Sequence, residues 1–449
     1  MSAIVHSANT GPESKITTGQ FLASKSEFDG RYRSGLFLAF ALILFSSGNP
    51  IFAPGGRSEL PLIPFALGLL VAIRASRHKY KNAWSILILA LFCAINLAQI
   101  ASSFGAPIQS ALGYLLRLFV AYGICRLARN APLLIVNAMS ILAAIAIAVF
   151  GMQVVCHVFA LDLAEALKPM AFAQGAADHI YTLIHNFNGP LDRFRNAGIF
   201  WEPGAFSGYC SVALILLALI RDKYSSHKYR LRLSILLIAI ATSQSTTGFV
   251  VLPPILLLHL SLAARKQTSV VPVVAVWLMG ALCIGSLAYI IMNAPAVRDK
   301  IQDQIAEVVT GKGHWQDTRV GTMIADVTDI MQRPWLGWGA NPLIRPSMAN
   351  ASVAIQHSVG NGLSNFLARF GVVGFITYVV ATTHGLMIST SRGLVASSFS
   401  TVLLCVILVG ENYLNYPLFL AFMFLGAQEI RGEMFHVRQY SDITIDVVA

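Results

Sequence analysis

The sequence has few charged residues and no cysteine pattern of a disulfide-rich fold. Only 12% of its 449 residues are charged, whereas 56% are apolar, and the mean hydropathy is +0.65. Soluble domains carry about 25% charged residues, so this composition excludes an ordinary soluble domain. All six cysteines lie in or at the edge of apolar stretches, and we therefore expect no extracytoplasmic disulfide.

Motifs for metals and nucleotides are also missing. The polar stretches contain no HExxH or HxxxH pattern, no DxD motif, no acidic cluster and no phosphate-binding P-loop. These absences disfavour a metal site and an ATP or nucleotide-sugar substrate. We expect no cofactor.

Long apolar runs are abundant. A helix of about 20 apolar residues crosses the hydrocarbon core of a bilayer, and we place about twelve such spans. The predicted fold class is an all-α polytopic membrane protein. A polar segment at 242–247 leaves open a re-entrant hairpin in place of the seventh and eighth spans. The predicted spans cover residues 35–51, 60–74, 84–101, 108–126, 132–157, 203–220, 231–245, 247–264, 270–292, 362–388, 394–410 and 414–430.

Lys and Arg set the orientation, because they gather on alternate connections and such basic connections stay cytoplasmic. The basic residues behind the net charge of +11 are spread over these connections and do not line one basic face. We therefore expect no nucleic-acid partner. The two long outer loops lie at 158–202 and 293–361, and the second contains two apolar series at helical spacing, predicting short amphipathic helices on the membrane or on the spans. The predicted organisation is a cytoplasmic tail (1–33), a transmembrane catalytic domain (34–430) and a second cytoplasmic tail (431–449).

One candidate group precedes the span at 203–220. Pro203 suits the first turn of that helix, where its missing N–H needs no partner, so Glu202 stands at the helix entrance. Glu202 can complement the helix dipole or polarise an acceptor hydroxyl. Arg195, in the polar segment before it, can meet lipid headgroups or bind an anionic substrate. Both interpretations stay open for each residue.

A second group lies in the later outer loop. Arg319 opens a predicted helix, and the turn at 337–339, Gly-Trp-Gly, can let backbone approach a ligand. His357 and Asn361 precede the next span. A neutral imidazole with a pKa of about 6.5 can accept a proton from a hydroxyl, so His357 is the candidate base, although a histidine in a loop is often only a surface residue. Asn361 is a candidate substrate ligand.

Arg117 interrupts the fourth predicted span. A charge at this depth is costly unless it faces a polar cavity or reaches the interface. We predict that Arg117 binds substrate or another anion, with a buried structural pair as the alternative.

These segments resemble the bacterial Wzy-type polysaccharide polymerases, within the O-antigen polymerase/ligase superfamily. The resemblance covers residues 190–390 and includes a Phe-x-Glu-Pro-Gly segment and the polar stretch at 242–248. Two positions depart from the pattern: segment 243–245 lacks the arginine of the ligases, and Ser358 replaces the asparagine that usually follows the histidine. The late-loop pattern consists of Arg319, Pro334, Gly337, Gly339, His357, Gly371 and Gly374.

The resemblance implies a metal-independent glycosyltransferase with a GT-C-like fold in the bacterial inner membrane. Its active site would face the periplasm, and its donor and acceptor would be undecaprenyl-pyrophosphate-linked glycans. The resemblance also implies that Arg195 and Arg319 hold the pyrophosphate and that His357 activates the acceptor hydroxyl. The expected partners are these lipid-linked glycans, the bilayer and a chain-length regulator.

The Glu-Pro-Gly segment favours a polymerase over a ligase that transfers glycan to lipid A core. A transporter or flippase of lipid-linked oligosaccharide is the alternative from another class. A carrier places its polar groups near mid-membrane in repeat-related broken helices, whereas most of these groups gather at the outer side. Arg117 is the feature that leans towards a carrier.

Overall fold

The structure is a computed structural model of the whole chain. The described parts are almost entirely helical, and the side chains before residue 30 and that of Arg319 are not among them. Described are residues 18–49, 59–75, 83–102, 107–128, 130–159, 161–171, 173–174, 180–188, 194–264, 319–341, 344–349 and 361–427.

Every predicted span within the described residues contains a helix. Five helices are long and apolar enough to cross a membrane: α3 (Ala83–Ala101), α4 (Ile108–Leu127), α5 (Ala131–Val158), α9 (Thr246–Ala264) and α14 (Gly362–Thr390). Others with apolar stretches are α1 (Thr18–Phe45), α2 (Glu59–Ala75), α7 (Pro203–Leu219) and α15 (Leu394–Gly410), and α8 (Ser226–Ser243) is a further long helix. Together these helices indicate a membrane protein. The predicted span at 270–292 lies outside the described residues, and α1 begins inside the predicted N-terminal tail.

The polar segment at 242–247 separates two long helices. α8 has 18 residues and α9 has 19, so each is about 27 to 29 Å long. Tyr229, near the start of α8, bonds to His259, near the end of α9, at 2.5 Å, so the two helices run antiparallel over most of their length. This pair is compatible with two spans, and the alternative of a re-entrant hairpin stays open.

The last predicted span, 414–430, takes a different form. α16 (Pro417–Ala421) continues directly as the 3-10 helix η10 (Phe422–Ala427). A close approach explains the change, because a Cβ at Gly385 of α14 would lie 2.5 Å from the Phe422 carbonyl oxygen. The segment packs against α4 and α14 and is almost wholly buried. Its described part is therefore an internal element and not a lipid-facing span.

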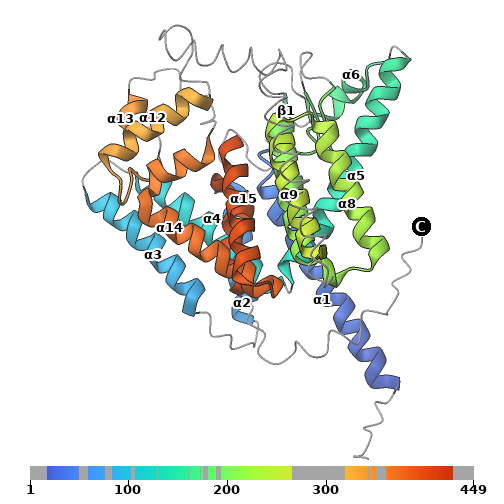
Figure 1. Cartoon of the computed structure of the whole chain (residues 1–449), viewed down its shortest axis with the longest axis horizontal. Coiled ribbons are helices and arrows are strands. Elements are labelled where there is room, and N and C mark those ends of the chain that lie inside the picture. Colours follow the sequence, from blue (N-terminus) through green and yellow to red (C-terminus); the bar gives the residue numbers. More distant parts are fainter. Residues whose placement is uncertain are drawn as a thin grey trace, which may run out of the picture.

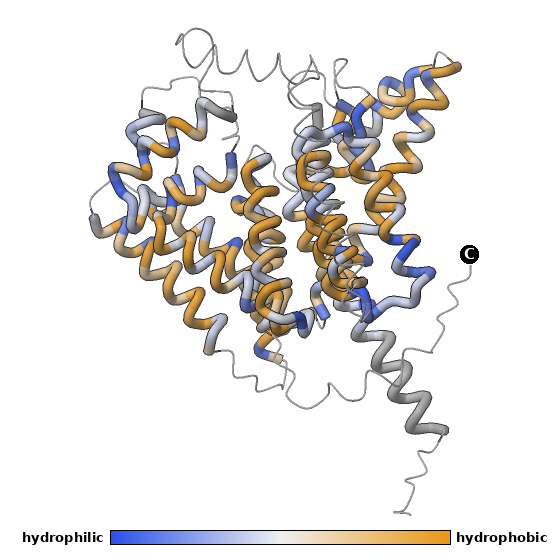
Figure 2. The backbone as a smooth tube through the Cα atoms, viewed as in Figure 1, coloured by the Kyte–Doolittle hydropathy of each residue, from blue (hydrophilic) through white to orange (hydrophobic). Residues whose placement is uncertain are grey.

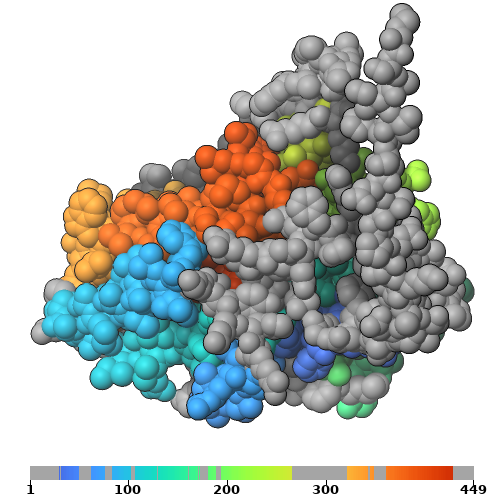
Figure 3. Space-filling view, turned by 90° about the horizontal axis from the view of Figure 1, so that it is seen from below, coloured from blue at the N-terminus to red at the C-terminus, as the bar shows by residue number. Residues whose placement is uncertain are grey.

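The central helix of the bundle is α7. All of its residues from Pro203 to Leu219 are buried, and it packs against α5, α8, α9 and α15. A helix that is apolar on all sides is stable only inside such a surround. In the view of Figure 3, the atoms of α3 border those of α4 and α14. The described cysteines, Cys93, Cys125, Cys156, Cys210 and Cys405, are all free.

The bundle has two distinct ends (Figure 1). The described parts of both long loops lie at the upper end, which we call the loop end. At the opposite end, the basic end, Lys223 donates to Asn130 at 3.0 Å and Arg392 pairs with Asp222 at 2.9 Å. Hydrophobic residues dominate the helices between the two ends (Figure 2). The structure thus gathers the predicted outer connections at one end and these basic connections at the other.

The assignment of compartments can be tested by labelling in a cysteine-free background. Lys168, after α6 (Leu163–Leu167), and Lys228, at the start of α8, are both exposed. We expect Lys168→Cys and Lys312→Cys to react with an impermeant thiol reagent in intact cells, whereas Lys228→Cys reacts only after permeabilisation. Labelling of Lys228→Cys in intact cells would reverse the orientation.

The first long loop adds a small sheet to an otherwise helical fold, which the all-α prediction did not include. Strands β1 (Ala173–Gln174), β2 (Ile180–Tyr181) and β3 (Asn186–Phe187) pair antiparallel in that order. Asn49, just after α1, donates to the Thr182 carbonyl at 3.1 Å and to the Asn186 side chain at 3.2 Å. These bonds fasten the sheet to the loop end of the bundle.

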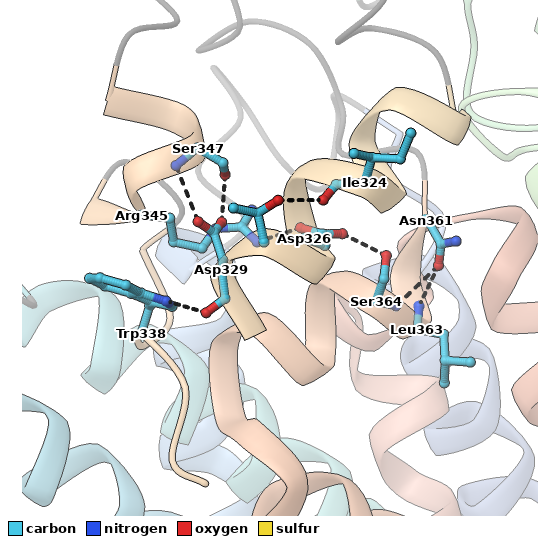
Figure 4. A network of polar contacts seen from close by, with 10 residues as sticks. Ile324, Asp326, Asp329, Trp338, Arg345, Ser347, Asn361, Leu363 and Ser364 are labelled. Carbon is cyan, nitrogen blue, oxygen red and sulfur yellow. Dashed lines mark hydrogen bonds and ion pairs between the residues drawn. The ribbon is translucent and has the colours of Figure 1, made fainter. Parts of the chain in front are cut away.

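In the second long loop, α12 (Arg319–Gln332) confirms the predicted helix, and its polar face is the one that packs inward. The polar residues Asp326 and Asp329 are fully buried, whereas Ile324 and Val327 of the predicted apolar face are 40% and 45% exposed. The polar face packs on the start of α14 and on α13 (Pro346–Ala349) (Figure 4). The other predicted helix of this loop, at 297–308, lies outside the described residues.

A buried ion pair causes this orientation of α12. Arg345, fully buried, lies 2.5 Å from Asp326 and 3.8 Å from Asp329. Asp326 also accepts from the Ser364 hydroxyl at 2.6 Å, and Asp329 accepts from the Ser347 hydroxyl at 2.5 Å. Burial raises the pKa of Asp326, and the Arg345 charge opposes that shift. The network joins α12 to the first turn of α14.

Removing Arg345 should loosen this loop. Arg345→Met leaves two carboxylates buried without their cation, and breaking such a pair typically costs about 3 to 5 kcal/mol. We expect a lower thermal midpoint and faster proteolysis within 319–349. The matched control is Glu165→Gln, which breaks an exposed pair with Lys168 and should cost less than about 1 kcal/mol. Equal effects of the two substitutions would show that the buried network does not hold the loop.

Candidate active site at the loop end

Glu202 is the N-cap residue of α7, and Pro203 is its first helical residue, as predicted. Its side chain makes no capping hydrogen bond, and its Oε1 atom is buried without a hydrogen-bond partner. The carboxylate is therefore not used to cap the helix, although it lies at the positive end of the helix dipole. Its Oε1 atom is thus a buried acceptor without a hydrogen-bond partner among the described residues.

A second carboxylate meets Glu202 over a glycine. A Cβ at Gly204 would lie 3.1 Å from Oε1 of Glu411 and 3.3 Å from Oε1 of Glu202. Both carboxylates therefore lie next to Gly204. Glu411 directly follows α15 and is 6% exposed. The two carboxylates therefore face the same glycine in the first turn of α7.

The second long loop ends at this carboxylate pair. Asn361 caps α14, because its side-chain oxygen accepts from the backbone N–H groups of Leu363 and Ser364, each at 3.1 Å (Figure 4). The next residue, Gly362, lies against the backbone of Glu411 and Asn412, where a Cβ would collide with both. The structure thus gives the Asn361 oxygen a structural role, and a role in substrate binding stays a prediction.

His357 and the Arg319 side chain lie outside the described residues. Their neighbours are placed. His357 precedes Asn361 by four residues, which span at most about 14 Å of extended chain. Arg319 begins α12, which the Asp326–Ser364 bond ties to α14. Both predicted groups are therefore tethered to the end that holds Glu202 and Glu411.

Arg195 is held beside the α8–α9 connection. Its Nε atom donates to the Ser243 carbonyl at 3.4 Å, and its own carbonyl accepts from Asn188 at 2.6 Å. Thr247, the second residue of α9, touches the position that a Cβ on Gly410 would occupy, next to Glu411. Two segments that carried the sequence resemblance, around 195 and 242–248, thus lie side by side.

Arg117 approaches the same carboxylates from α4. That helix begins at Ile108, as the sequence predicted, and Arg117 is half-buried. Burial raises the pKa of the Tyr416 phenol, between α15 and α16, to about 12, while the charge of Arg117 lowers it and the charges of Glu411 and Glu202 raise it. Arg117, Glu202 and Glu411 therefore act on one phenol.

The glycines of the turn at 337–339 serve another purpose than the predicted one. Gly337 and Gly339 have φ values of +67° and +106°. A Cβ at Gly337 would lie 2.5 Å from the Arg369 carbonyl carbon, so the close approach is to the backbone of α14 and not to a ligand. The turn is part of the support of α14.

The sequence analysis missed Glu411, Tyr416 and Arg369 as site residues. Glu411 ends an apolar run in a short outer connection, and Arg369 interrupts a predicted span as Arg117 does. The second pattern was a usable signal. The proximity of Glu411 to Glu202 was not, because it arises from packing between helices far apart in the chain.

Part of the chain is similar to a known family. Residues 231–379 match the family model described as O-Antigen ligase. This match confirms the resemblance to the O-antigen polymerase/ligase superfamily. No curated protein matches the chain. The superfamily suggests polymerase or ligase activity, that is, a membrane enzyme that transfers glycosyl groups. The matched segment includes Arg319 and His357, whereas Arg117, Arg195, Glu202 and Glu411 lie outside it.

Proposed function

We propose that the protein polymerises undecaprenyl-pyrophosphate-linked oligosaccharide repeat units into a surface polysaccharide. The reaction takes place at the periplasmic face of the bacterial inner membrane and needs no metal. The observation that carries this proposal is the convergence of Glu202, Glu411 and Arg117 at the end where the Arg319–His357 loop is anchored. Acid–base groups and guanidinium groups are the two components that glycosyl transfer from a pyrophosphate requires.

The proposed step is a single displacement with inversion. A sugar hydroxyl of one lipid-linked repeat attacks the anomeric carbon of a second, longer glycan. The bond between that carbon and the pyrophosphate oxygen breaks, and the lipid pyrophosphate leaves with the electron pair. His357 takes the hydroxyl proton, and Glu202 orients the hydroxyl. Arg195 and Arg319 stabilise the charge that grows on the leaving group.

The carboxylate pair supports an acceptor subsite between these groups. Trp201 stacks on Tyr416 with ring centroids 5.0 Å apart, next to Glu202. Aromatic faces beside carboxylates suit sugar rings, which present C–H groups on one face and hydroxyls at the edge. Glu411, on the opposite side of Gly204, then bonds a second hydroxyl of the acceptor.

Two alternatives remain. The matched family model bears the description of a ligase, so transfer of glycan to lipid A core is the second candidate. The Glu-Pro-Gly segment supports the polymerase in preference. A transporter is disfavoured because Glu202 and Glu411 lie at the ends of α7 and α15, whereas Arg117, within α4, is the feature shared with a carrier.

Analysis of surface glycans in cells that lack the gene separates these functions. We expect single repeat units on the surface and no longer chains, with restoration by the wild-type gene. Full-length polymer accumulating on the lipid carrier would indicate a ligase instead. Repeat units trapped at the cytoplasmic leaflet would indicate a transporter.

A further inference from the structure

Arg369 is a buried cation within α14. Its side chain is 5% exposed, which is costly for a charge in a membrane-spanning helix. It lies over the ring of Tyr114, 5.3 Å from the centroid, and its Nη1 atom donates to the side-chain oxygen of Asn415. The Nε atom is buried without a hydrogen-bond partner.

The charges around Arg369 do not neutralise it. The Tyr114 phenol favours the charged form of Arg369, Arg117 and Arg345 act on it as like charges, and Asp326 is the opposite charge with the weakest effect. Asp326 is already bonded by Arg345 at 2.5 Å. Across the described ranges, no carboxylate lies within ion-pair distance of Arg369. A buried guanidinium with no carboxylate partner among the described residues is a candidate site for a bound anion.

The backbone of α14 is interrupted next to Arg369. Gly371 has a φ of +64°, which breaks α14. The Arg369 carbonyl accepts from the Gly339 N–H at 2.9 Å and from the Gln99 amide at 2.8 Å. The Val372 N–H donates to the Pro334 carbonyl at 2.7 Å. The 334–339 turn thus provides hydrogen-bond partners for the backbone groups freed by the break and holds the backbone of Arg369 in place. Broken helices often form binding sites in membrane proteins.

We propose that Arg369, together with Arg117, binds the pyrophosphate headgroup of a second lipid-linked glycan, the acceptor. The inference rests on the proposed function, because a polymerase joins two such lipids whereas a ligase uses one. Arg195 lies by the α8–α9 connection, and Arg369 lies by α4 and Asn415. Glu411 contacts the first region through Gly410 and Thr247, and it acts on Tyr416 in the second region. The carboxylates therefore stand between two anion sites.

Binding stoichiometry tests this proposal. The full-length protein in nanodiscs of zwitterionic lipid is titrated with a labelled polyprenyl pyrophosphate, and two molecules should bind. Arg369→Gln should remove one of them or weaken it by about 10- to 100-fold, the loss of one charge-assisted bond. Arg369→Lys should recover part of the binding. The matched control is Arg392→Gln at the basic end, which should leave two bound.

Asn415→Asp separates ligand binding from structural support. The new carboxylate would accept from Arg369 where the amide does now, which should raise the thermal midpoint. It should also remove one bound pyrophosphate lipid by competing for the cation. A purely structural Arg369 predicts a stabilised protein that still binds two, and that outcome overturns the proposal even if Arg369→Gln fails to fold.

Competition experiments identify the ligand, and a comparison of polymer formation with lipid binding separates this proposal from the proposed function. Phosphatidylglycerol or inorganic pyrophosphate competing as well as the polyprenyl pyrophosphate would contradict a substrate site. A protein that makes no polymer, yet loses one lipid in Asn415→Asp, overturns the polymerase and leaves the second site in place. A protein that makes polymer and binds two lipids in Asn415→Asp overturns the second site alone.

Discussion

His357→Ala lowers turnover by about 10²- to 10⁴-fold, the usual contribution of a general base, while the protein remains folded and inserted. Binding of the lipid-linked donor changes far less, because the arginines are retained. Turnover of the wild type should fall as the pH drops below about 6.5, since protonation removes the base, and this limb should disappear in the variant. Single-turnover rates across pH measure both effects.

His185 is the natural control for this result. It lies at the loop end and is 1% exposed, and burial lowers the pKa of its imidazole to about 4. Its titration therefore falls below the pH range of the limb. Wild-type turnover in His357→Ala, together with complete loss in a well-expressed Glu202→Gln, would assign the base to Glu202 and leave His357 as a surface residue.

Arg195→Ala and Arg319→Ala each lower turnover by about 10²- to 10³-fold, the loss expected when one preorganised donor to the transition state is removed. Lysine at either position restores only part of the rate, because it cannot form the bidentate fork with a phosphate. A chelator should leave the wild-type rate unchanged. The measurement is release of the lipid pyrophosphate by purified protein.

Arg392→Ala serves as the control for loss of an arginine, since that side chain bonds Asp222 and the Leu219 carbonyl at the basic end. Its turnover should match the wild type. Complete loss of activity in the chelator, with recovery on adding a divalent metal, would refute the metal-free mechanism.

The spans were predictable because their signal is local. A run of apolar residues about 20 long specifies a membrane helix with little help from the rest of the chain. The described starts of α4, α7 and α14 fall within one residue of the predicted starts at 108, 203 and 362. The last span departs for a non-local reason, the close approach of η10 to Gly385.

The face of α12 that packs inward could not be predicted from periodicity. The sequence shows that Ile324, Val327 and Met331 share a face, but it does not show which face packs inward. Arg345 decides this, because a buried guanidinium draws Asp326 and Asp329 towards it. An amphipathic pattern identifies the two faces of a helix, but the neighbouring residues determine which face is buried.

The candidate site was predictable in part. Arg195 and Glu202 were found because charged residues next to apolar spans stand out, and Arg117 because it interrupts one. The sequence around Glu411 resembles that of any polar residue at the end of a span. Only its closeness to Gly204 in the structure identifies it as a candidate site residue. Arg369 was not predicted as a site residue, although it interrupts a span as Arg117 does. Its burial and its unpartnered Nε atom, which only the structure shows, mark it as a candidate.

The most direct test of the account uses purified protein and one defined undecaprenyl-pyrophosphate oligosaccharide in the presence of a chelator. We predict a ladder of glycans at multiples of the repeat, with one lipid pyrophosphate released for each linkage formed. The absence of a ladder, with transfer only when lipid A core is supplied, would contradict the polymerase and make the protein a ligase.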